Sequence, residues 1–74
     1  MDITPNQSQR IKSDWEVIAK EPIDLQIIGG QLYAFCSELA AYRIAMHYKE
    51  GLFEGTAKVD FSENLKSWFF RLEI

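Results

Sequence analysis

Gly29 and Gly30 stand between two segments in which apolar and polar residues alternate. This alternation is typical of β-strands with one buried face. Two adjacent glycines supply the positive φ angles that a two-residue hairpin turn needs. The sequence therefore predicts a β-hairpin whose turn places Ile28 opposite Gln31. In this register one face is wholly apolar and carries Ile23, Leu25, Ile27, Leu32, Ala34 and Cys36.

A second hairpin is predicted at the C-terminal end of the chain. Apolar and polar residues alternate from Ala57 to Phe61 and again from Trp68 to Ile74, on either side of a four-residue turn at 63–66. The turn length places Phe61 opposite Trp68, and one face is again apolar. That face carries Ala57, Val59, Phe61, Trp68, Phe70 and Leu72.

A helix is predicted to begin at Pro5, because Thr4 is a good N-cap and Gln7 completes a capping box with it. Its apolar stripe is narrow and consists of Ile11, Trp15 and Ile18. We expect Trp15 to lie in the core, where it would clamp the helix to the sheet. Pro22 should end the helix, because the residue before a proline is pushed out of the α region.

A second helix is predicted over 38–50, with Ser37 as its N-cap and Gly51 as a left-handed C-cap. Residues 52–55 then form a loop. The expected buried stripe consists of Leu39, Tyr42 and Met46, widened by Ala41, Ala45 and Tyr48. We expect a helix this apolar to be covered on most of its sides.

The expected order is helix, hairpin, helix, hairpin, which predicts the α+β class. We expect one domain over 1–74, with a four-stranded, mainly antiparallel sheet and both helices packed on its apolar face. The order of the two hairpins within the sheet does not follow from these patterns.

The opposite face of the sheet is the most informative feature for function. Its large side chains are Ile28, Tyr33, Phe35 and Phe69, with Arg71 among the charged residues beside them. Exposed aromatic residues rimmed by charges often mark a partner surface. We expect a non-enzymatic interaction or regulatory module that binds a protein partner or a second copy of itself. Alternatively, the first helix or the 52–55 loop covers these rings, or the rings only pad the sheet.

Base stacking on these aromatic side chains is a further alternative, since sheets with exposed rings bind single-stranded RNA. The formal net charge of −3 argues against nucleic-acid binding, which usually needs a basic patch. No stretch is long and apolar enough to span a bilayer, and no secretory signal begins the chain. We therefore expect a cytoplasmic protein that does not bind membranes.

Catalytic and metal-binding patterns are missing from the sequence. Cys36 and His47 are the only cysteine and histidine, and about 16 Å of helix would separate them, too far for a nucleophile–base pair. We therefore expect no catalytic residues, no metal and no cofactor, and a packed Cys36. The alternative function is a small-ligand or anion site in a cleft beside the second helix, lined by Tyr42, Arg43 and His47.

Two segments of the chain, Gly29–Arg43 and Phe61–Glu73, resemble stretches of small bacterial proteins of uncharacterised function, including cyanobacterial ones. The resemblance covers only these segments. It implies no activity, no cofactor and no site residue.

Overall fold

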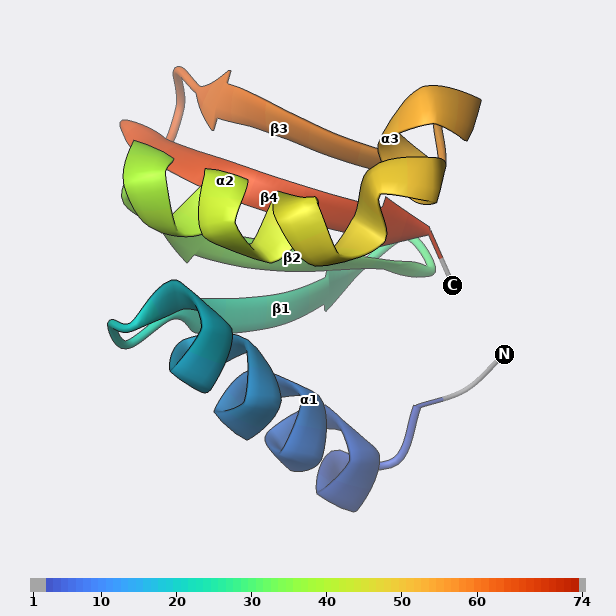
Figure 1. Ribbon diagram of the computed structural model, residues 1–74. Coiled ribbons are helices and arrows are strands. Elements are labelled where there is room, and N and C mark those ends of the chain that lie inside the picture. The colour runs from blue at the N-terminus through green and yellow to red at the C-terminus, as the bar shows by residue number, and fades with distance from the viewer. Residues whose placement is uncertain (1–2, 74) are drawn as a thin grey trace.

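The computed structural model describes residues 3–73, which form the expected succession of helix, hairpin, helix and hairpin (Figure 1). The helices are α1 (Pro5–Ala19), α2 (Glu38–Ala45) and the short α3 (Lys49–Glu54), with the 3-10 turn η1 (Met46–Tyr48) between the last two. The strands are β1 (Asp24–Ile28), β2 (Gln31–Cys36), β3 (Ala57–Ser62) and β4 (Ser67–Glu73). The predicted α+β class is confirmed. Ile74, predicted to end the last strand, lies outside the described residues.

The four strands form one antiparallel sheet in the order β1-β2-β4-β3. Both hairpin registers are as predicted: Ile28 pairs with Gln31 across the first turn, and Phe61 pairs with Trp68 across the second. Gly29 has the positive φ angle that the first turn requires. The two hairpins join through β2 and β4, which places these strands at the centre of the sheet and leaves β1 and β3 at its edges.

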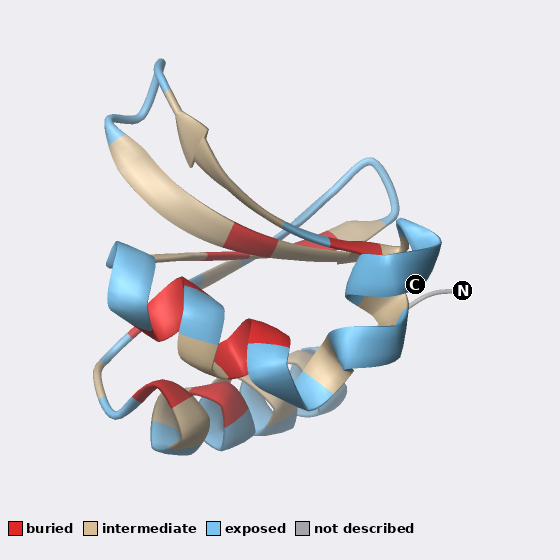
Figure 2. Cartoon of the chain, turned by 45° about the horizontal axis from the view of Figure 1, so that its top comes forward, coloured by how far each residue is buried: buried red, intermediate tan, exposed pale blue. Residues whose placement is uncertain are grey.

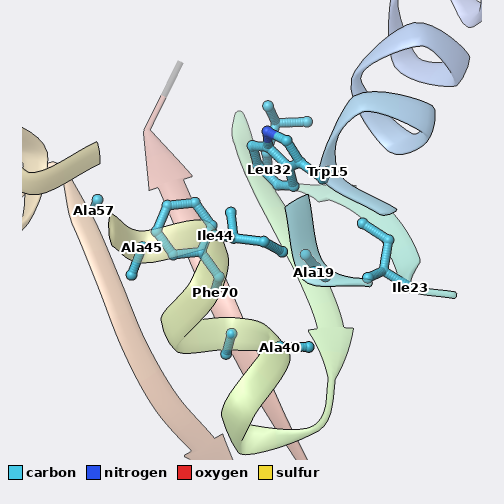
Figure 3. Packing of buried hydrophobic residues seen from close by; sticks show 11 residues of the cluster. Trp15, Ala19, Ile23, Leu32, Ala40, Ile44, Ala45, Ala57 and Phe70 are labelled. Atoms are coloured by element: carbon cyan, nitrogen blue, oxygen red, sulfur yellow. The ribbon is translucent and has the colours of Figure 1, made fainter. Parts of the chain in front are cut away.

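Helices α1 and α2 lie together on one side of the sheet (Figure 2). We call the side facing them the inner face and the opposite side the outer face. The core lies between the inner face and the helices (Figure 3). Phe70 of β4 is fully buried there, and its ring packs edge-on against Trp15 of α1 at 5.3 Å between ring centroids. The predicted core position of Trp15 is confirmed.

Helix α1 begins as predicted, because the Thr4 and Gln7 side chains form the reciprocal capping box. It ends at Ala19, where Lys20 takes the left-handed conformation, before Pro22 is reached. Two glutamate side chains fix the segment that follows, and one of them is Glu16, which accepts a hydrogen bond from the backbone N–H of Ile23. Glu21 accepts hydrogen bonds from the hydroxyl and backbone N–H of Ser37, which ties the end of α1 to the start of α2.

The predicted helix over 38–50 with a cap at Gly51 is wrong. The regular helix stops at Ala45, and the chain continues through η1 into α3, which ends at Gly55 with a φ of 87°. The break comes where Tyr48 leaves helical geometry and its hydroxyl accepts a hydrogen bond from the Trp15 indole at 3.0 Å. Gly51 lies inside α3, where a Cβ atom would come within 3.0 Å of Ala57, so close packing, not a turn, favours glycine there.

The predicted buried stripe of α2 is wrong for its three main residues, although Ala41 and Ala45, predicted to widen it, are buried. Leu39 and Met46 are each 59% exposed, and Tyr42 is 50% exposed. The helix instead buries its smaller side, which consists of Ala40, Ala41, Ile44 and Ala45. The bulk of the core comes from the aromatic residues that face these alanines, so α2 can lie close to the sheet only through a side with small residues.

None of the helices within residues 3–73 combines the length and the apolar composition that crossing a membrane requires.

Candidate interaction surface

The strand registers arrange the outer face as rows of side chains that run across all four strands. Row A consists of Asp24, Phe35, Phe69 and Asp60, in the order β1, β2, β4, β3. Row B lies next to it and consists of Gln26, Tyr33, Arg71 and Lys58. The outer face therefore has an aromatic centre on β2 and β4 and charged or amide side chains on the edge strands.

Three aromatic rings pack against one another at this centre. The Tyr33 and Phe35 rings are nearly parallel, with centroids 5.9 Å apart. Phe69 completes the cluster at 5.3 Å from Tyr33 and 5.8 Å from Phe35. All three are half-buried, although no helix within residues 3–73 lies on this face. We call these three residues the aromatic cluster; their contacts with one another contribute to this partial burial.

Charged groups on β3 flank the aromatic cluster. Lys58 and Asp60 form an ion pair of 3.0 Å between Nζ and Oδ2. The hydrogen bond from Lys58, together with one from the backbone N–H of Phe61, lowers the pKa of the Asp60 carboxyl. Both side chains are about half exposed, so the pair contributes little to stability and stays available to a partner.

Arg71 stands between Tyr33 and Lys58 in row B. One of its terminal nitrogens donates to the Gly55 carbonyl at 3.4 Å, at the long end of the hydrogen-bond range. Its Nε atom is shielded from solvent and has no hydrogen-bond partner among the described residues. A guanidinium carries five N–H donors, so Arg71 keeps most of its donor capacity unused.

Ile28 lies at the corner of the outer face, beside the Gly29–Gly30 turn, and is 47% exposed. It is separated from the aromatic cluster by Gln31, which accepts a hydrogen bond from the Tyr33 hydroxyl and donates to Glu73. The structure thus brings Tyr33, Phe35, Phe69 and Arg71 together and leaves Ile28 at the margin. The alternative that the first helix or residues 52–55 cover the rings is wrong, because no helix within residues 3–73 lies on the outer face, and residues 52–54 belong to α3 (Figure 2).

The residues of the alternative ligand site do not converge. The guanidinium of Arg43 donates to the carbonyl of Ala19 at 3.0 Å and so caps the C-terminal end of α1. Tyr42 is half exposed and lies outside the core. His47 borders an open depression of about 520 Å³ near α3, which neither Tyr42 nor Arg43 lines.

Cys36 lies at the end of β2, half-buried, and its thiol donates to the Ala34 carbonyl. Burial and the nearby Glu21 carboxylate raise the pKa of this thiol to about 11, so it is protonated at neutral pH. His47 is exposed at the opposite end of the α2–η1 segment. Within residues 3–73, no group of three or more His, Cys, Asp or Glu side chains gathers in a way that could hold a metal ion.

Several apolar residues outside the sheet are exposed, which the sequence pattern does not predict. They include Leu39, Tyr42 and Met46 on α2 and Phe53 on α3, which is 95% exposed. The alanines at 40, 41 and 45 were the available signal, because small residues at helical spacing allow a helix to approach a sheet closely.

Comparison with known protein families, with characterised proteins and with solved structures finds no match to this chain. The resemblance of segments Gly29–Arg43 and Phe61–Glu73 to bacterial proteins therefore stays a prediction.

Proposed function

We propose that this domain is a protein-interaction module and that it binds its protein partner through the outer face of the sheet. The observation that carries the proposal is the aromatic cluster, three rings that pack on one another without a covering helix. Tyrosine, phenylalanine and arginine are enriched at the centres of protein interfaces. The charged side chains of the edge strands would form the polar rim around such a centre.

The mutual packing of the three rings before any partner binds supports the same proposal. Tyr33, Phe35 and Phe69 restrain one another in the free chain, so a partner would meet an ordered surface and little side-chain entropy would be lost on binding. The acidic balance of the chain disfavours nucleic acid as the partner, although the rings themselves could stack on bases.

A display library of protein fragments tests the proposal when it is selected against the immobilised wild-type domain. Purified binders should lose at least about tenfold in affinity for Phe69→Thr, which keeps a strand-forming residue but removes the ring. Phe53→Thr is the matched control, since Phe53 is more exposed than Phe69 but lies outside the sheet. Binders that depend on Phe53 and ignore Phe69 would contradict the proposal.

A labelled single-stranded oligonucleotide provides the second arm of the test. We expect no change in its fluorescence anisotropy with the wild-type domain at physiological salt. Binding that weakens steeply with salt and disappears in Phe69→Thr would assign the outer face to nucleic acid and overturn the protein-binding proposal.

A further inference from the structure

We propose that the partner of the outer face is a second copy of this chain, stacked sheet on sheet about a two-fold axis. The axis runs across the strands, in the plane of the interface, between row A and row B. This inference rests on the proposed function, because it names the partner of the same surface.

Such an axis places each strand over the same strand of the second copy and lays row A over row B. A two-fold interface must be complementary to itself, and the two rows meet that condition on every strand. The facing pairs are Asp24 with Gln26, Phe35 with Tyr33, Phe69 with Arg71, and Asp60 with Lys58 of the second copy. Each pair occurs twice, so all eight side chains of the two rows meet a suitable neighbour.

At the centre of the interface, each facing pair contains at least one aromatic ring. Phe35 would stack on Tyr33 of the second copy, and the Arg71 guanidinium would lie over the Phe69 ring as a cation–π contact. The rings of the aromatic cluster would thus be covered by the Tyr33, Phe35, Phe69 and Arg71 side chains of the second copy instead of by solvent.

At the β3 edge, the facing pairs are charged. Lys58 and Asp60 already pair within one chain at 3.0 Å. The axis brings two such pairs together with opposite orientation, so that every positive group has negative groups beside and opposite it. Packed sheets cross at about 30°, which displaces the edge strands most, and the long Lys58 side chain can follow that displacement.

The alternative axis, parallel to the strands and between β2 and β4, is disfavoured by charge. It would lay β1 over β3 of the second copy and bring Asp24 against Asp60 twice. Like charges placed opposite each other at an interface oppose association. The two axes therefore predict opposite effects for reversal of the charge at Asp60.

Sedimentation analysis from micromolar to millimolar concentration tests the proposal on the full chain. We expect the wild type and Phe53→Thr to dimerise alike. Asp60→Lys and Lys58→Asp should each raise the dimer dissociation constant by about tenfold or more, since each puts like charges opposite one another. The double variant Lys58→Asp/Asp60→Lys should return to within about threefold of wild type, because it restores every opposite-charge pair.

Thermal unfolding of the same four variants controls for loss of fold. We expect the charge variants to remain folded, since Lys58 and Asp60 are half exposed and lie on an edge strand. A tighter dimer in Asp60→Lys would overturn the proposed axis in favour of the parallel one. A wild type that stays monomeric at millimolar concentration would overturn self-association, whereas Phe69-dependent binding of another protein would then leave the proposed function standing. Loss of both would end both proposals.

Discussion

The inner and outer faces of the sheet carry equal numbers of aromatic residues, but only the inner face has a ring that helices cover completely. The inner face has Phe61, Trp68 and Phe70, and the outer face has Tyr33, Phe35 and Phe69. Phe70 is buried from above, by Trp15 and the small side of α2 (Figure 3). The rings of the aromatic cluster pack against one another, and no helix within residues 3–73 covers them. Phe61 and Trp68 differ from Phe70, because they are only partly buried and pack edge-on against each other at 5.7 Å, outside the core. Phe70 therefore contributes to stability through the core, whereas the aromatic cluster holds its rings in place and leaves them accessible.

The largest effect expected from this contrast separates two neighbouring residues of β4. Phe70→Ala should cost about 3–5 kcal/mol of unfolding free energy, because it opens a cavity in the core. Phe69→Ala should cost about 1–2 kcal/mol, the worth of its lateral ring contacts. Urea unfolding monitored by circular dichroism measures both values.

A domain of this size has about 4–11 kcal/mol of stability in total, so Phe70→Ala can leave it largely unfolded. Phe70→Leu is the matched variant that keeps most of the side-chain volume, so it should remain folded. Its unfolding free energy should be no higher than that of Phe69→Ala. Equal costs for Phe69→Ala and Phe70→Ala would mean that the outer face is as fully packed as the inner one.

The next largest effect on stability separates the buried and the exposed side of helix α2. Ala41 is fully buried, so Ala41→Leu should cost about 1–3 kcal/mol through overpacking. Leu39→Ala, on the exposed side, should change stability by no more than about 0.5 kcal/mol. The reverse order in urea unfolding would restore the stripe of Leu39, Tyr42 and Met46 as the buried one.

The smallest effect concerns Cys36, the last residue of β2, which is half-buried. Its thiol pKa is raised from 9.0 to about 11 in the folded chain. Because the folded state holds this proton more tightly, the resulting stability is fully present below pH 9 and is lost as pH rises towards 11. Since Cys36 is only half-buried, we expect a loss of under about 1 kcal/mol.

The comparison of wild type with Cys36→Ala isolates this contribution, because other groups titrate alike in both chains. Their difference in unfolding free energy should shift against the wild type between pH 9 and 11. A difference that does not change with pH would show that the thiol is not shielded.

The hairpins could be predicted from sequence because their signals agree with one another. The alternation and the Gly29–Gly30 turn independently require the same register, and a one-residue slip would expose the apolar face. The composition of the outer face followed directly from that register. The contact between Phe35 and Phe69 did not, because it depends on the pairing of β2 with β4 across separate hairpins.

Helix α2 was harder to predict because two of its sides have helical apolar spacing. Hydrophobicity alone favours the larger residues, Leu39 and Met46, as the buried ones. The structure buries the alanine side because Phe70 and Trp15 already fill the space between the helices and the sheet. The ligand site expected around Arg43 failed to converge for a similar reason, since the guanidinium is engaged by the end of α1.

An isotope-filtered NOE experiment on a mixture of labelled and unlabelled chains detects only contacts between copies, so it tests directly whether the outer faces of two copies pack on each other. Packing of row A on row B predicts intermolecular cross-peaks between the Tyr33 ring and the Phe35 ring of the other copy. Intermolecular contacts from Leu39 and Met46 of α2 in their place, or none at millimolar concentration, would contradict it.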